Sequence, residues 1–352
     1  MVYQFYSLGE NRVLGFKKRP EEESMVDNNY NILGSCHGWL VLLNKHDCDM
    51  FLSNPLTGGH IKLPPIQALP DIPILIFDCS PDEKDGSCRV IIAYGERRNR
   101  LAFCCPGTST EWTTLGDLSG YESCVYSSRQ GLFFCCIKNY YGAHVVNHFE
   151  AWDLQDPLSP KKTIRLAVSM DHQDNNRHLL DRKKACGCFE FLVSTETSDE
   201  IFLVRRFVKH WMGPHGLDDS TPYTTVGFNV YRYDPETGSL KYMDGSLGGL
   251  ALFVGSNNGF ALSAAEFPEL KPNSIYYTTP PQWSDCCGGH DVGIFNYQDQ
   301  TFSPCFYPPD VESRKRVSGP MWFTPTRLVR SPFLVKNQDG SLSYAFSSSS
   351  NH

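Results

Sequence analysis

Residues 51–63 carry the sequence Phe51-Leu52-Ser53-Asn54-Pro55-Leu56-Thr57-Gly58-Gly59-His60-Ile61-Lys62-Leu63. This pattern predicts a strand, a tight turn and a second strand, because Pro presets φ, Asn caps the turn through its side chain and Gly supplies a left-handed exit. The pattern returns in Tyr231-Arg232-Tyr233-Asp234-Pro235-Glu236-Thr237-Gly238-Ser239-Leu240. The two copies indicate a repeated β-hairpin.

Weaker copies of the turn lie at Gly9-Glu10-Asn11, Pro106-Gly107-Thr108, Asp156-Pro157 and Gln298-Asp299-Gln300. The intervals between turns are about 40 to 80 residues, and four-stranded propeller blades take about 40 to 50 residues each. Short β-branched and aromatic runs fill the intervals, whereas helical periodicity is almost absent. We therefore predict an all-β chain that forms a single β-propeller with six blades, five or seven being the alternatives.

The two ends of the chain are expected to close the ring. The first repeat begins only a few residues into the sequence, so the inner strands of its blade have to come from elsewhere. Met321-Trp322-Phe323 and Pro332-Phe333-Leu334-Val335 are the candidates, and a blade shared by the two ends would remove the exposed edges of an open ring. We expect the propeller to span residues 1–335 and residues 336–352 to form a flexible tail.

Composition and charge argue against nucleic acid and membrane partners. The net charge is −7 and the basic residues form no concentrated stripe, which a phosphate-tracking surface would need. No apolar run approaches the ~20 residues of a membrane span, and the first residues lack the features of a signal peptide. The sequence therefore favours a cytoplasmic or nuclear protein, in which most of the 14 cysteines are reduced core residues.

No enzymatic site emerges from the residues. Cys286, Cys287 and His290 have the wrong spacing for a usual zinc knuckle, and packing explains Cys186 and Cys188. The expected sets of catalytic, cofactor-binding and metal-binding residues are therefore empty. The alternative is an enzyme on a propeller scaffold, such as a sugar-directed hydrolase or lyase, which would need acidic or His side chains from several blades to converge near the central channel.

One loop stands out as a contact surface for a partner protein. Packing between blades accounts for Trp39, Trp112 and Trp152, because large aromatics dominate sheet packing. Trp211 instead lies in a polar insertion beside Met212 and His215. An aromatic residue in such a loop has less reason to be core, so we expect these three residues to bind a partner.

Several strings resemble the plant KIB-type β-propeller, an F-box-associated domain long classed as of unknown function. Near the start they are GSCHGWLVL (34–42), LSNPLTG (52–58) and IKLPP (61–65), and near the end FVGSNNGF (253–260), FPELKPNSIYY (267–277) and MWFTP (321–325). The resemblance covers about residues 3 to 326. It implies structural roles for Gly38, Trp39, Asn54, Pro55, Gly58, Gly255, Asn273, Tyr276 and Trp322.

In that family the propeller usually follows an F-box, a helical module that docks on a Skp-type adaptor of a cullin ubiquitin ligase, while the propeller presents the client. The resemblance therefore implies a non-enzymatic protein-recognition module for a client of unknown identity, used in ubiquitin-ligase substrate recognition. Nothing before Tyr3 provides the forty or so residues of helical spacing that an F-box needs. We expect this chain to bind a client without a Skp-type adaptor, as a stand-alone binder or a competitor of full-length relatives.

Overall fold

A computed structural model gives the fold. It describes residues 2–10, 12–17, 30–44, 47–66, 74–78, 88–95, 99–116, 120–141, 144–167, 186–195, 198–210, 223–255, 258–278, 291–305, 321–324, 333–336 and 342–345. Every regular element in these ranges is a strand, so the all-β prediction is confirmed. Within the same ranges, the search for a membrane-crossing helix of sufficient length and apolarity returns nothing.

The strands follow one another as antiparallel meanders. The first pair, β1 (Val2–Ser7) and β2 (Arg12–Lys17), forms a hairpin, and three four-stranded sheets follow it. The first of these sheets contains β3 (Tyr30–Cys36), β4 (Trp39–Asn44), β5 (Met50–Ser53) and β6 (His60–Lys62), and the second contains β7 (Ile74–Asp78), β8 (Arg89–Tyr94), β9 (Arg100–Cys104) and β10 (Thr113–Leu115). The third contains β11 (Tyr121–Ser127), β12 (Leu132–Tyr141), β13 (His144–Asp153) and β14 (Lys161–Ala167).

The following nine strands form one larger sheet with two parts. The first part contains β15 (Gly187–Thr195), β16 (Ile201–His210), β17 (Tyr223–Asp234) and β18 (Ser239–Tyr242). The second contains β19 (Leu250–Val254), β20 (Gly259–Ser263), β21 (Ser274–Tyr277), β22 (Gly293–Asn296) and β23 (Thr301–Pro304). The two parts are joined by a parallel pairing of β15 with β20. A last hairpin consists of β24 (Phe333–Lys336) and β25 (Leu342–Ala345).

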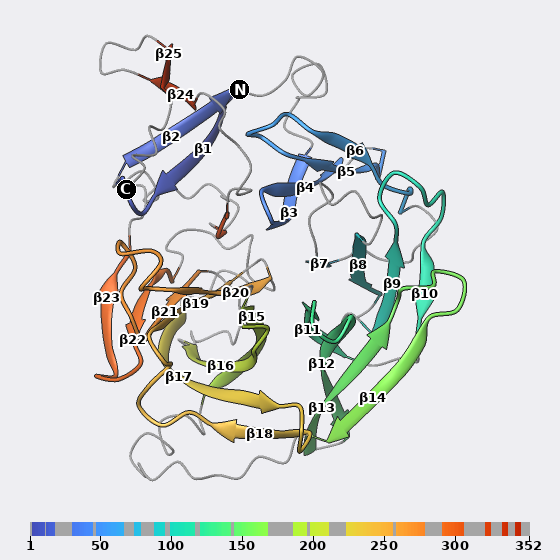
Figure 1. The fold of residues 1–352 in the computed structure, drawn as a ribbon, viewed down its shortest axis with the longest axis vertical. Coiled ribbons are helices and arrows are strands. Elements are labelled where there is room, and N and C mark those ends of the chain that lie inside the picture. Colours follow the sequence, from blue (N-terminus) through green and yellow to red (C-terminus); the bar gives the residue numbers. More distant parts are fainter. Residues whose placement is uncertain are drawn as a thin grey trace, which may run out of the picture.

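These groups of strands are arranged in a ring, with the first strands of the four-stranded meanders toward the centre and the last toward the rim (Figure 1). Burial follows this arrangement. Every residue of β8 is buried, because neighbouring sheets cover both of its faces, whereas β6, β18 and β23 are largely exposed. The ring agrees with the propeller predicted from the sequence.

The repeated turns occupy equivalent places. Asn54 begins the connection between β5 and β6, and Asp234 ends β17 before β18, so both turns join the third and fourth strands of a meander. In each turn the side-chain oxygen accepts a hydrogen bond of 3.0 Å from the N–H two residues later. Gly58 and Gly238 then donate to the carbonyls of Asn54 and Asp234, with φ of 72° and 64°. The predicted equivalence of the two turns is confirmed.

The weaker turn copies fall at the same kind of place. The turns at residues 106–108 and 156–157 join the third and fourth strands of the next two sheets, and the turn at 298–300 joins β22 to β23. Residues 9 and 10, the described part of the first copy, lie in the turn between β1 and β2. The local turn chemistry therefore marks the rim of the ring, where each hairpin returns toward the next group of strands.

The hydrophobic core is divided among the spaces between neighbouring groups. Val90 and Met50 belong to one cluster that joins the β3–β6 and β7–β10 sheets, and further clusters join each following pair. Adjacent cysteines show the division clearly, because buried Cys135 and Cys136 face opposite sides of β12 and belong to different clusters. Among the described residues, eleven cysteines are free thiols.

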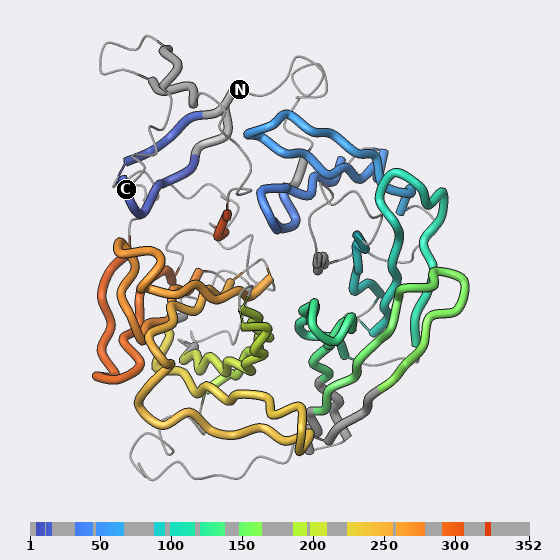
Figure 2. The backbone as a smooth tube through the Cα atoms, viewed as in Figure 1, coloured from blue at the N-terminus to red at the C-terminus, as the bar shows by residue number. Residues whose placement is uncertain are grey.

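Described segments from the C-terminal part of the chain lie against the β1–β2 hairpin. Figure 2 shows residues 321–324 as a short red segment on the ring side of this hairpin, and the ring of Phe323 contacts that of Phe5 of β1 at a tilt, with centroids 4.7 Å apart. This segment takes the inner place expected for Met321-Trp322-Phe323, but it is not a strand, and β1 and β2 form a sheet of two strands only. β24, in contrast, lies beside β2 on the outer side, so the other candidate segment, 332–335, supplies no inner strand. β25 falls within the expected tail, and the number of blades stays a prediction.

Candidate functional site

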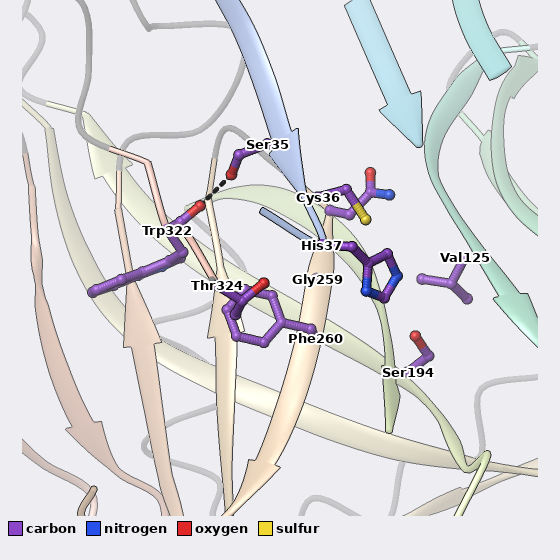
Figure 3. Close-up of a pocket in the computed structure, with 10 residues that line it drawn as sticks. Ser35, Cys36, His37, Val125, Ser194, Gly259, Phe260, Trp322 and Thr324 are labelled. Carbon is purple, nitrogen blue, oxygen red and sulfur yellow. Dashed lines mark hydrogen bonds between the residues drawn. The ribbon is translucent and has the colours of Figure 1, made fainter. Parts of the chain in front are cut away.

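The inner strands of four groups converge on a cavity, called the axial cavity below and shown in close-up in Figure 3. Its volume is about 40 Å³. Its walls come from the end of β3 and the β3–β4 turn, from β11, β15, Asn258 with β20, and from the 321–324 segment. The described residues that line it are Ser35, Cys36, His37, Val125, Ser194, Asn258, Gly259, Phe260, Trp322 and Thr324.

A tight hairpin turn brings His37 to this cavity. Cys36 pairs with Trp39, so His37 and Gly38 are the two turn residues between β3 and β4. Both have positive φ, 46° and 83°, as a type I′ turn requires. Gly38 adopts this conformation without strain, and His is one of the side chains that tolerate it. The imidazole of His37 projects toward Val125 and Ser194 in Figure 3.

The 321–324 segment is tied to both sides of the cavity. The hydroxyl of Ser35 donates a hydrogen bond to the carbonyl of Trp322, 287 residues away in the chain. The indole N–H of Trp322 donates to the carbonyl of Val254 at 3.1 Å, and its ring meets Phe253 edge-on at 5.2 Å. Trp322 therefore joins the last strands of the ring to the first sheet.

Two glycines allow close packing on the β20 side. A Cβ on Gly259 would overlap with the backbone carbonyl of Leu192, so glycine permits the parallel pairing between β15 and β20. A Cβ on Gly255 would overlap with the side chain of Thr278. Both positions thus need glycine for space rather than for a left-handed conformation.

Asn273 and Tyr276 hold the loops next to β21 in place through hydrogen bonds. The side-chain oxygen of Asn273 accepts hydrogen bonds from the N–H groups of Leu247 at 2.9 Å and Gly249 at 3.1 Å. The hydroxyl of Tyr276 accepts one from the N–H of Lys271 at 2.9 Å. The remaining residues singled out by the resemblance build the first sheet, where Trp39 begins β4 and Pro55 lies in the β5–β6 turn.

Charged side chains are found between the groups of strands. Arg206 is fully buried and donates from Nε to the hydroxyl of Thr225 at 2.8 Å and from Nη2 to the carboxylate of Asp291 at 3.2 Å. Its guanidinium also covers the ring of Tyr277 at 4.8 Å. Burial, with Asp291 adding to it, holds the pKa of Tyr277 well above its ordinary value. This network connects β16 and β17 to the strands that follow.

The sequence model of the family described as "KIB1-4 beta-propeller" matches residues 5–296. The match covers far more than half of the chain. The chain belongs to the KIB1-4 β-propeller family. This membership agrees with the ring of antiparallel sheets and with the motifs that build its first sheet and its closing segment.

Two curated relatives of this KIB propeller come from Arabidopsis thaliana. An F-box protein is 34% identical over 86 residues, which are 24% of this chain and 20% of the relative. A putative F-box protein is 35% identical over 86 residues, which are 24% of this chain and 23% of that relative. The aligned part of the chain thus spans about a fifth of the length of these relatives.

Solved structures show only a distant likeness to the KIB propeller. The extracellular domain of a putative one-component system from B. thetaiotaomicron has a TM-score of 0.39 and 10% identity, covering 98% of this chain and 36% of that one. Kuenenia stuttgartiensis hydrazine synthase has a TM-score of 0.37 and 10% identity, and the match covers 88% of this chain and 81% of that one. We draw no functional argument from likenesses of this size.

The expected contact residues Trp211, Met212 and His215 lie outside the described residues, as do Cys286, Cys287 and His290. The strands on either side of residues 211–222 show where the chain leaves the sheet before Trp211. β16 ends at His210 and β17 begins at Tyr223, opposite the start of β15. Ser194, in the cavity, lies near the other end of β15. Strand direction thus separates the cavity from the place where the loop begins.

Sequence reasoning did not predict the cavity, although eight of its ten described residues lie in the strings 34–42, 253–260 and 321–325. These strings were interpreted as structural motifs and not as the lining of one cavity, and Val125 and Ser194 lie outside them. A usable signal was the pair His37-Gly38 between two strand-forming runs, since a two-residue turn ending in Gly favours a hairpin. Among the described residues, no cluster of His, Cys, Asp or Glu has the geometry of a metal site.

Proposed function

We propose that this KIB propeller is a protein-recognition module that holds a client protein without catalysing a reaction. The observation that carries the proposal is the family match over residues 5–296. The F-box names of the two Arabidopsis relatives support a place in ubiquitin-ligase substrate recognition. A closed ring suits such a role, because rigid sheets position the loops that a partner contacts.

The geometry adds a physical reason for a rigid display surface. Buried ion pairs and hydrogen bonds join neighbouring groups of strands, as between Arg206 and Asp291. In the same way, Arg89 donates from Nε to the carbonyl of Leu154 at 3.0 Å, which connects β8 to the end of the next sheet. A scaffold held in this way loses little conformational entropy when it binds, which favours affinity.

Affinity purification of the 352-residue chain from plant tissue, followed by mass spectrometry, tests the proposal. We expect one specific client to be recovered at near-stoichiometric amounts and to bind the purified chain directly. A titration with the purified client then gives the dissociation constant. Turnover of that client, or of a sugar polymer, by the purified chain would contradict the proposal and favour the hydrolase or lyase alternative.

The Skp-type adaptor serves as a second partner in the same experiment. All regular elements in the described residues are strands, whereas the F-box is a helical module. We therefore propose that these 352 residues alone bind the client but not the adaptor. Adaptor binding to the purified chain at micromolar strength, about −8 kcal/mol, would contradict this second statement.

A further inference from the structure

The axial cavity has a neutral lining. None of its ten described residues is Asp, Glu, Lys or Arg. A cationic side chain entering the cavity would therefore give up its hydration without gaining a carboxylate partner from these walls, and an anion would meet only the imidazole of His37. The lining selects for an uncharged group.

Two hydroxyl groups of the cavity are free for a ligand. Ser194 belongs to β15 and Thr324 to the closing segment, and Figure 3 draws them on different walls. Within the described ranges, no hydrogen bond engages the side-chain hydroxyl of either residue. Ser35 and Trp322 differ from them, because they use their polar groups to bind each other and Val254. A hydroxyl donates one hydrogen bond and accepts others, so the free pair can satisfy both a donor and an acceptor.

The volume admits a small polar group. A water molecule needs about 10–15 Å³ of occupied space, so a cavity of about 40 Å³ has room for at least three non-hydrogen atoms. A carboxamide has three such atoms, and it carries both a donor and an acceptor. Val125 and Phe260 provide apolar walls for the methylene that precedes it.

We propose that the axial cavity is the specificity site of this propeller and takes the side-chain carboxamide of an Asn or Gln from the client. Thr324 and Ser194 hydrogen bond to the amide, and Val125 and Phe260 contact its methylene. This inference rests on the proposed recognition function and adds the chemistry of the anchoring side chain.

Acetamide is the probe, because it presents the carboxamide and one methyl group alone. Methyl-labelled full chain is titrated with acetamide, and the methyl signals of Val125 are followed by NMR. Acetate has nearly the same shape but carries a charge. We expect saturable shifts with acetamide and an affinity at least about tenfold higher than for acetate, because acetate keeps its charge in a neutral site.

The double variant S194A/T324V removes both hydroxyls and leaves the shape of the cavity almost unchanged. It should weaken acetamide binding about tenfold, since two hydrogen bonds are lost. The matched control is S159A/T114V, at two exposed positions outside the cavity, which should leave acetamide binding unchanged. The comparison of acetamide with acetate on the unmodified chain does not depend on how the variants fold.

Three results would overturn the assignment: Val125 signals that do not move with acetamide, acetate binding as tightly as acetamide, or full acetamide binding by the folded S194A/T324V variant. Failure here is distinguishable from failure of the proposed function. Client capture is measured separately on the unmodified chain, and a client that binds while acetamide does not would place the anchoring contact elsewhere on the propeller.

Discussion

The indole of Trp39 lies directly against Gly59, so that a Cβ on Gly59 would overlap with the far edge of the indole ring. Trp39 is only 4% exposed, and its ring belongs to the cluster between the first two four-stranded sheets. The large indole of Trp39, which begins β4, therefore fills the space that Gly59 leaves by having no side chain. This match explains why two successive glycines end the turn in the first repeat.

Gly59→Ala should lower the free energy of unfolding by about 1 to 3 kcal/mol, because the added methyl forces a buried ring to move. Gly34→Ala is the matched control, since nothing lies within 4 Å of a Cβ built there. Denaturant unfolding of the two variants checks the prediction. Equal stability of the two variants would contradict the packing relationship between Trp39 and Gly59.

Arg206→Met should cost about 3 to 5 kcal/mol of folding free energy, because it leaves the carboxylate of Asp291 without its buried cationic partner. Arg232→Met is the comparison, since Arg232 pairs with Glu200 at 3.2 Å on the surface and should contribute less than about 1 kcal/mol. The same denaturant titration measures both. A small loss for Arg206→Met would mean that the network between the two parts of the large sheet contributes little.

The turn chemistry of this propeller was predictable from sequence because it is local. Asn54 and Asp234 cap their turns through atoms two or three residues away, so the short pattern contains all of the interacting groups. Closure of the ring depends instead on contacts such as Ser35 with Trp322, which join distant segments. The sequence offered two candidate segments for this closure, and only the three-dimensional packing separates Trp322 from residues 332–335.

The cavity could not be predicted for the same reason. Ser194 and Thr324 become neighbours of one space only because inner strands and the closing segment converge there. Ser194 lies in an ordinary strand, and the string 321–325 that contains Thr324 does not indicate which residues it contacts. Burial and hydrogen bonding of individual hydroxyls depend on the completed ring, so no periodicity or motif in the chain reports them.

The cysteines provide a test of burial at two adjacent positions. Burial raises the pKa of the Cys104 thiol far above its ordinary value, whereas the neighbouring Cys105 is partly exposed. Native protein at pH 8 should therefore react with iodoacetamide at Cys105 and not at Cys104, because the thiolate is the nucleophile. Mass spectrometry of the labelled peptide reads both sites. Thiol counting after denaturation without reductant should give nearly all 14 cysteines, and several disulfides would contradict the expected reduced state.

Asp234 should titrate at an unusually low pH. Two hydrogen bonds lower the pKa of Asp234 from 3.8 to about 2. The one from the side chain of Lys241 has the larger effect, and the one from the backbone N–H of Glu236 has the next largest. The folded-state pKa is depressed, so the stabilisation is present above pH 3.8 and is lost as the pH falls toward 2. An NMR titration of the carboxyl group gives the value directly. Lys241→Met should move the midpoint upward, and an unchanged midpoint would show that Lys241 does not govern it.

The last prediction separates the axial cavity from the 211–222 loop as the client contact. The cavity and the strand ends that flank residues 211–222 lie toward opposite ends of β15 and β16, so a compact client held at one end need not touch the other. We predict that S194A/T324V weakens binding of the purified client at least about tenfold, in keeping with two lost hydrogen bonds to a buried group.

Trp211→Ala is the counterpart, because Trp side chains dominate many protein interfaces and their truncation costs more than about 2 kcal/mol where they do. For a client anchored in the cavity, Trp211→Ala should leave the dissociation constant unchanged within a factor of about three. Isothermal titration of the purified client against each folded variant makes the comparison. The opposite pattern, with a large loss of affinity for Trp211→Ala and no loss for S194A/T324V, would assign the client contact to residues 211–222. That is the contact that Trp211 predicts from sequence alone.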